Sequence, residues 1–197
     1  MRPLVPTMKR LPLALILLWF LLASLPCTIG AAQADPPEIK DIIVTTSDAD
    51  LLLFATVKNG FTPEMLDAVK AGTPLVFTFQ LELVKTSDHW LDTSLVATAV
   101  THTLSWDAAQ QHYRVVFSNQ GDQGTTTKDV EQAKQLMAEL NGVKVIGLSG
   151  LVPDAPYAIH FKVVMKKGTL PLGMHNVLPF SSLWNFETDW RTIEFRY

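Results

Sequence analysis

The sequence predicts a mainly β protein, an antiparallel β-sandwich-like domain with two short-to-medium helices. Several segments alternate apolar and polar residues with the period of two that is typical of half-buried strands. Turn-forming residues separate these segments, and only two stretches have the caps or the apolar stripe of a helix. Strands with polar outer faces favour two antiparallel sheets packed face to face. An α+β domain with one large antiparallel sheet is the alternative.

The strand over residues 75–84 has the clearest pattern. Its alternate positions hold large apolar side chains on one face: Leu75, Phe77, Phe79, Leu81 and Leu83. Residues 157–166 alternate in the same way. The other expected strands cover residues 41–46, 51–57, 95–106, 112–117, 143–146 and 192–197. From the apolar faces of the two clearest strands we expect a shared core that contains Phe77, Phe79, Leu81, Phe161 and Val163.

Cap residues predict the first helix, and an apolar stripe predicts the second. The first helix should cover residues 63–71, with Thr62 as its N-cap and Gly72 as its C-terminal cap. The second should cover residues 128–140, where apolar side chains recur at helical spacing. Thr126 begins a sequence that resembles a capping box, with Asp in the place of the usual Glu. Because this helix interrupts the run of strands, the chain is not a simple meander.

Residues 1–34 have the three parts of a secretory signal peptide. Basic residues come first, an uncharged apolar stretch follows over residues 11–25, and Ala32-Gln33-Ala34 fits an A-x-A cleavage site. Cleavage after Ala34 would leave residues 35–197 as a single β-rich globular domain in the periplasm, with no membrane span. The alternative is an uncleaved signal that tethers the protein to the membrane, although residues 11–25 are fewer than the ~20 needed to cross a bilayer.

Composition restricts the chemistry of residues 35–197. Cys27 is the single cysteine and would leave with the signal, which excludes disulfides, thiolate catalysis and cysteine–metal sites in the mature chain. Lipid attachment at Cys27 is a further alternative, but Pro26 stands where a bacterial lipobox has a small residue. Loss of the three basic signal residues takes the formal net charge from −3 to −6. Because the remaining basic residues are scattered, we expect no nucleic-acid partner.

No motif identifies an active site, a cofactor site or a metal site. The histidines have no metal-ligand spacing, although a turn at residues 107–111 could bring His102 close to His112. Residues 147–150 resemble a nucleophile elbow, but Leu151 follows where that motif needs glycine. We therefore assign no catalytic residues, no cofactor and no metal.

The tryptophans late in the sequence give the one candidate contact surface. Trp184 and Trp190 share a segment with other aromatic residues, and such a cluster either closes the edge of a core or forms a recognition surface. Pro171 excludes residues 170–173 from a regular central strand. A loop there should hold both tryptophans against a sheet edge or an open end. Trp184 and Trp190 are therefore the candidate contacts for a partner.

Short motifs along residues 35–197 carry a family resemblance. They are the Ala71-Gly72-Thr73-Pro74-Leu75 strand start, the Trp90/Asp92 pair, the Leu170-Pro171-Leu172 segment and the Trp184…Asp189-Trp190 run. Together with the signal peptide, they make the chain resemble an exported bacterial family known as domain of unknown function 4390. That family has no established activity or catalytic residues to transfer. The resemblance implies an association with a membrane sensor kinase of the nitrogen-regulation type, near which relatives are often encoded.

Two functional hypotheses follow. The first is a non-enzymatic binding or protein-interaction module of the cell envelope, whose partner is an unknown envelope protein such as that sensor kinase. The alternative is a periplasmic hydrolase with an unrecognised active site. The lack of a catalytic motif, of cysteine and of metal-ligand spacing favours the first. A deep pocket with converging polar groups would support the hydrolase, whereas a shallow groove or an exposed strand edge would support the binding module.

Overall fold

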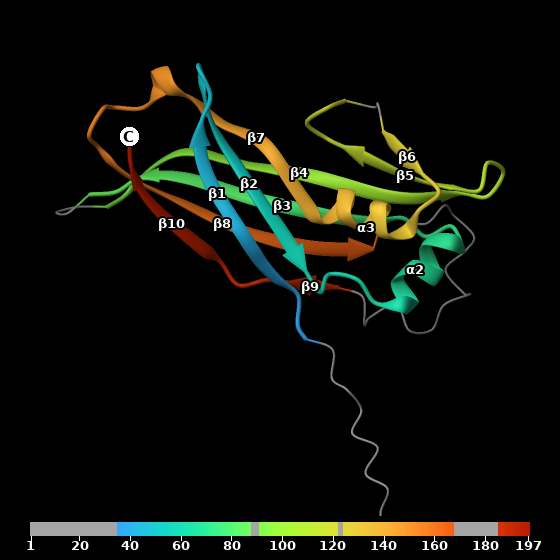
Figure 1. Cartoon of the computed structure of the whole chain (residues 1–197). Coiled ribbons are helices and arrows are strands. Elements are labelled where there is room, and N and C mark those ends of the chain that lie inside the picture. The colour runs from blue at the N-terminus through green and yellow to red at the C-terminus, as the bar shows by residue number, and fades with distance from the viewer. Residues whose placement is uncertain (1–34, 88–90, 122–123, 168–184) are drawn as a thin grey trace, which may run out of the picture. The chain divides into compact units, whose positions relative to one another are not determined.

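Figure 1 shows the computed structural model, which describes residues 35–87, 91–121, 124–167 and 185–197. Residues 1–34, and with them the expected signal peptide, lie outside these ranges. Trp184 and residues 170–173 lie outside them as well. No helix in the described part of the chain is both long and apolar enough to cross a bilayer.

Two antiparallel sheets and two helices make up the described part of residues 35–197. The strands are β1 (Glu38–Thr46), β2 (Asp50–Lys58), β3 (Leu75–Lys85), β4 (Thr93–Asp107), β5 (His112–Phe117), β6 (Thr125–Thr127), β7 (Glu139–Gly147), β8 (Pro156–Lys167), β9 (Phe186–Glu187) and β10 (Arg191–Arg196). The helices are α2 (Pro63–Lys70) and α3 (Val130–Ala138), and a short 3-10 helix, η1, covers Leu148–Gly150. One sheet has the order β1-β2-β7, and the other has the order β10-β8-β3-β4-β5-β6, with β9 beside β8. The mainly β, sandwich-like class with two helices is confirmed, and the chain forms two sheets rather than the one large sheet of the alternative.

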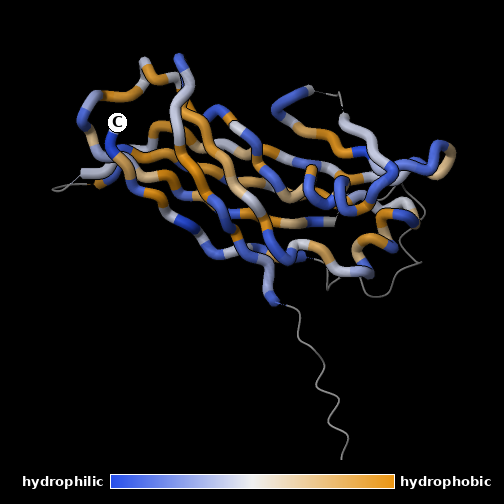
Figure 2. Tube along the Cα trace, viewed as in Figure 1, coloured by the Kyte–Doolittle hydropathy of each residue, from blue (hydrophilic) through white to orange (hydrophobic). Residues whose placement is uncertain are grey.

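β3 is the central strand of the larger sheet. It pairs with β4 on one side and with β8 on the other, over all of residues 75–85. Every second residue of β3 from Leu75 to Leu83 is buried, as the alternation predicted. Figure 2 shows hydrophobic and hydrophilic residues alternating along the strands. This alternation places one face of the larger sheet against the smaller sheet and leaves its other face more polar.

Local capping fixes α2 as predicted. Thr62 Oγ1 accepts a hydrogen bond from the Met65 N–H at 3.4 Å. Gly72 has a φ of 94°, a left-handed conformation in which a side chain would be strained. The Thr73 N–H then donates to the Ala68 carbonyl at 2.9 Å, which closes the end of the helix. These bonds fix the two ends of α2, which packs against β4 at one end of the larger sheet.

The second helix begins later than predicted. α3 covers Val130–Ala138 rather than 128–140, and its N-cap is Asp129 rather than Thr126. Asp129 Oδ1 accepts a hydrogen bond from the Glu131 N–H at 2.9 Å, which satisfies one of the free amides at the start of the helix. An aspartate at this position also places a negative charge at the positive end of the helix dipole.

The helix passes into a strand without a loop. Glu139 adopts an extended conformation and begins β7, which pairs with β2. The predicted strand over 143–146 is therefore the second half of β7. Leu140 is buried in β7. Because an apolar residue suits a helical stripe and a buried strand equally well, periodicity extended the predicted helix through it.

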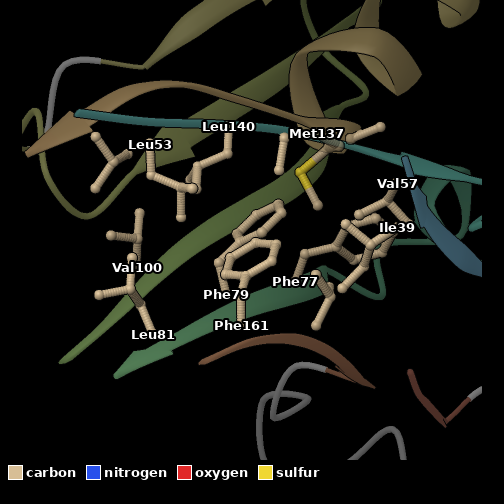
Figure 3. Close-up of a cluster of buried hydrophobic side chains, with 14 of the residues drawn as sticks. Ile39, Leu53, Val57, Phe77, Phe79, Leu81, Val100, Met137, Leu140 and Phe161 are labelled. Atoms are coloured by element: carbon tan, nitrogen blue, oxygen red, sulfur yellow. The ribbon is translucent and has the colours of Figure 1, made fainter. Parts of the chain in front are cut away.

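The core lies between the two sheets, as the close-up in Figure 3 shows. The predicted core residues all have exposed fractions between 0% and 5%: Phe77, Phe79, Leu81, Phe161 and Val163. Phe79 stacks on Phe161 with ring centroids 6.2 Å apart and meets the edge of Phe77 at 6.5 Å. The smaller sheet and α3 contribute further buried side chains, among them Ile39, Leu53, Val57 and Met137. The prediction of a shared core is confirmed.

His102 is a buried histidine on the core side of β4, with an exposed fraction of 3%. Its Nδ1 donates a hydrogen bond to the Met137 carbonyl at 3.1 Å. The rings of Phe79 and Phe117 lie 4.6 and 4.7 Å from the imidazole, centroid to centroid. Burial lowers the pKa of His102 to about 4, against the opposing effect of the hydrogen bond to the Met137 carbonyl. The imidazole is therefore neutral at pH 7.

Replacing Phe79 by Ala should lower the free energy of unfolding by about 3–5 kcal/mol, because a buried ring is lost and a cavity remains. Chemical denaturation followed by circular dichroism would measure the loss. Gln80→Ala, on the other face of the same strand, is the matched control and should change the free energy of unfolding by less than about 0.5 kcal/mol. Equal losses for the two variants would show that the Phe79 ring does not stabilise the core.

The free energy of unfolding should also fall as the pH is lowered from about 6.5 to about 4. In this range the unfolded chain binds a proton at His102 and the folded chain does not, so protonation favours the unfolded state. Below pH 4 the loss from this histidine reaches about 3 kcal/mol. Denaturation midpoints across the range would measure the slope. His102→Leu should flatten it and His160→Gln should not; an unchanged slope in His102→Leu would refute this assignment.

Candidate functional site

The two sides of the sandwich are closed differently. On one side α3 packs against β2 of the smaller sheet and against β4, β5 and β6 of the larger sheet. On the other side the edge strands are β1, in the smaller sheet, and β10, in the larger one. No helix in the described part of the chain covers these two edges, and a groove lies between them. We call this groove, lined by residues 38–42 and 190–193, the edge groove.

The edge groove has a volume of about 680 Å³. Its aliphatic part comes from three isoleucines, of which Ile39 is buried and Ile42 and Ile193 are half-buried. Charged side chains of both signs stand beside them, including Asp41 and Arg191. A shallow, open hollow of this composition suits a polypeptide better than a small apolar ligand, which needs a more enclosed pocket.

Trp190 lies in the lining of the edge groove and is 49% exposed. Lys162 Nζ stands 4.7 Å from the centroid of its ring, which is a cation–π contact, and Lys162 also forms an ion pair with Glu187. These contacts order the indole and leave about half of it free. An ordered aromatic side chain can bury a large apolar area on binding with little loss of entropy. Trp184, the other candidate contact, lies outside the described residues.

β1 carries a bulge where it borders the groove. From Lys40 to Ile43 the register advances by three residues along β1 but by only two along β2, so Asp41 and Ile42 share one partner position. Asp41 has a φ of 54°, in the left-handed region. Ile43, the first residue after the bulge, is 56% exposed. A bulge of this kind interrupts the hydrogen-bonding edge of a strand.

β10 is held to the larger sheet through β8, with which it forms a regular antiparallel ladder. The segment before β10 is fixed in the same way. The Thr188 N–H donates to the Val163 carbonyl at 3.0 Å, and Thr188 Oγ1 accepts from the Val163 N–H at 3.0 Å. Trp190 therefore lies on a short stretch of chain whose two ends are both bonded to β8.

A second hollow, of about 570 Å³, lies between the end of β2 and α3. Four of its polar side chains, all from α3 and the start of β7, bond with one another in two pairs. Lys134 Nζ lies 2.9 Å from a carboxylate oxygen of Glu131, and the Gln135 side-chain amide donates to Glu139 at 2.8 Å. Because these groups satisfy each other, this hollow offers a ligand fewer free contacts than the edge groove does.

The other residues that the sequence analysis considered for catalysis or metal binding do not form a site. His102 pairs with Phe117 in the ladder between β4 and β5, whereas His112 pairs with Asp107, so the two histidines lie five positions apart along the hairpin. Ser149 is exposed within η1, and η1 joins β7 to β8 rather than a strand to an α-helix. Within the described ranges, no group of three or more His, Cys, Asp or Glu side chains could hold a metal ion.

The part of the groove that β1 supplies was not predicted from the sequence. The predicted strand began at residue 41, whereas β1 begins at Glu38. A signal was present, since Ile42 and Ile43 are adjacent apolar residues that break the alternation after Ile39, and such a break indicates a bulge. The approach of β1 to β10 has no local signal, because it depends on strands far apart in the sequence.

Comparisons with known proteins identify the family. Searches of curated proteins and of solved structures find no match to the chain. A family model described as "Domain of unknown function (DUF4390)" matches residues 34–194. The match includes the whole lining of the edge groove and all strands of the two sheets except the end of β10. The chain therefore belongs to the DUF4390 family, as its short motifs indicated.

Proposed function

We propose that this protein is an exported, periplasmic, non-enzymatic interaction module that binds an extended polypeptide of another envelope protein in the edge groove. The observation that carries the proposal is the pair of sheet edges beside the half-exposed Trp190. The edge of a sheet presents unpaired main-chain N–H and C=O groups, and many peptide-binding domains recognise their ligands through such groups. Tryptophan commonly supplies a large share of the binding energy of an interface.

Two features of the sequence support the cellular setting of this proposal. Residues 1–34 have the order of basic, apolar and small residues that directs export, and Ala34 is followed by the first residues of the folded domain. The motifs that gave the family resemblance also favour an envelope partner, for which a membrane sensor kinase is the first candidate. A soluble domain outside the inner membrane could reach the extracytoplasmic part of such a kinase.

The hydrolase alternative gains no supporting observation in the described ranges. The nearest approach to a nucleophile–base pair is His160 Nδ1, which lies 3.0 Å from the Thr192 hydroxyl. Both side chains lie on the outer face of the β8–β10 ladder. No third group among the described residues bonds to the other ring nitrogen of His160, as nucleophilic catalysis would require.

Export predicts the first residue of the mature protein. Mass spectrometry of protein purified from its native host should find a chain that begins at Asp35, because signal peptidase cleaves after a small-x-small sequence. Ala34→Arg should block cleavage and leave the full-length chain in the membrane fraction. Lys40→Arg, inside the mature domain, is the control and should be cleaved normally. A cytoplasmic chain that keeps Met1 would contradict export.

Binding in the edge groove predicts that Trp190 contributes to affinity. A photo-crosslinking amino acid at Thr192 should capture a polypeptide partner in intact cells, whereas the same amino acid at Leu91, which is 80% exposed elsewhere, should not. Trp190→Ala should then weaken binding of the purified partner by about fivefold or more, because the exposed indole no longer buries apolar area. Leu91→Ala is the matched control for affinity.

Circular dichroism would verify that Trp190→Ala remains folded, which is expected because the indole is half-exposed. If Trp190→Ala binds the captured partner as tightly as the unaltered protein does, the contact surface is not the edge groove. Equal capture from positions 192 and 91 would lead to the same conclusion.

A further inference from the structure

Hydrogen-bond directions show which main-chain groups of β10 point away from β8. Both main-chain groups of Val163 in β8 bond with Thr188, so they point towards the outer edge of the sheet rather than towards β3. Successive residues of a strand turn these groups to opposite sides. Every second residue of β8, from Val163 back to Tyr157, therefore bonds outwards, and the corresponding partners in β10 are Arg191, Ile193 and Phe195.

The main-chain groups of the residues between these partners point in the opposite direction. The N–H and C=O groups of Thr192, Glu194 and Arg196 point away from β8, where the described part of the chain provides no further strand. The alternation continues at Tyr197, whose N–H points back towards the β8 side and donates to the Ala155 carbonyl at 3.5 Å. Among the described residues, nothing pairs with this edge, and β10 presents along it a regular series of alternate main-chain donors and acceptors.

The facing edge of β1 is different. Its bulge at Asp41 and Ile42 breaks the regular spacing of main-chain groups, and Asp41 holds a left-handed conformation there. Glu38 and Lys40, on either side of Ile39, form an ion pair of 2.7 Å that leaves their charges engaged with each other. A strand can therefore pair regularly with β10 but not with this part of β1, which instead forms the opposite wall of the edge groove.

Side chains on the free edge restrict the chemistry of an added strand. Ile193 turns towards the core side and lines the groove. On the outer face, Thr192 is engaged by His160, and Arg196 Nη1 donates to the Asp154 carbonyl at 2.8 Å. Glu194 stands between them, and no ion pair to it occurs among the described residues. The central position of the edge therefore presents a negative charge to whatever pairs with it.

We infer that the partner of this protein adds a strand antiparallel to β10, with apolar residues opposite Ile193 and a lysine or arginine opposite Glu194. This inference rests on the proposed function and specifies the ligand of the same groove. Antiparallel addition continues the pattern of the larger sheet, in which every pair is antiparallel. Opposite charges on directly paired residues stabilise a sheet, and like charges destabilise it.

A synthetic peptide can test the inference before the natural partner is known. The probe is Glu-Val-Lys-Val-Thr-Val, fluorescein-labelled at its N-terminus and amidated at its C-terminus, which matches the six residues of β10. In antiparallel register its lysine lies opposite Glu194 and its valines lie on the side of Ile193. Fluorescence anisotropy of the mature protein with this probe should show saturable binding. The charge-exchanged peptide Lys-Val-Glu-Val-Thr-Val should bind about two- to fivefold more weakly.

Main-chain methylation of the probe distinguishes a strand from an unpaired ligand. Methylation of the lysine amide, which faces β10 in this register, should weaken binding by about tenfold or more, because it removes a ladder hydrogen bond and adds bulk at the edge. Methylation of the next valine amide, which faces away from β10, should have little effect. This comparison uses the unaltered protein, so it does not depend on the folding of a variant.

Variants of Glu194 test the same contact from the protein side. Glu194→Pro removes an N–H that points away from β8, which a strand edge tolerates, and should weaken probe binding by about tenfold or more. Glu194→Ala keeps the N–H and is the matched control, with a loss of about two- to fivefold at most. Glu194→Lys should reverse the preference between the two charge-exchanged peptides. Circular dichroism would verify folding of each variant.

Different failures have different meanings. Equal binding of the two methylated probes, or no probe binding at all, would overturn strand addition to β10. If in addition Trp190→Ala still weakens binding of the cross-linked partner, the edge groove keeps its proposed function and only the mode of recognition is wrong. A concentration-dependent dimer of the protein that Glu194→Pro abolishes would show that β10 pairs with a second copy, and would also overturn the inference.

Discussion

The packing of Phe77, Phe79 and Phe161 between the two sheets is the contact on which the rest of the structure depends. Cys27 is the only cysteine in the chain, so residues 35–197 contain no disulfide and apolar burial must stabilise them. β3 and β8 supply these rings from neighbouring strands in register. Because β8 is fixed on its inner side by this core, it can hold β10 on its outer side, and β10 in turn forms one wall of the edge groove.

The unequal widths of the two sheets explain why a groove exists. A three-stranded sheet packs on a seven-stranded one, so the smaller sheet is too narrow to cover the apolar face of the larger. α3 covers the part near β4, β5 and β6. On the other side β1 stops short of β10, and the half-buried Ile42 and Ile193 are left in the gap between them. The groove is a consequence of incomplete coverage at one side of the sandwich.

Alternation in the sequence was sufficient for most of the strands, because burial on one face forces a period of two. The same alternation places His102 between Val100 and Leu104 on the buried face of β4, so the burial of this histidine could also be predicted from the sequence. The end of α3 could not be predicted, because Leu140 fits a helix and a strand equally well. The edge groove was beyond prediction for a different reason. Its walls come from residues 38–42 and 190–193, and only the order of strands in space brings them together.

The continuous passage from α3 into β7 has a consequence for how the domain opens. His102 belongs to the larger sheet and bonds to the Met137 carbonyl near the end of α3, and two residues later the chain enters the smaller sheet at Glu139. With no loop to absorb movement, sliding of one sheet over the other would have to break this bond or bend the junction. We therefore expect the sheets to resist shear and to separate in one cooperative step. In hydrogen exchange, the amides of β4 and β7 would then become unprotected together rather than sheet by sheet.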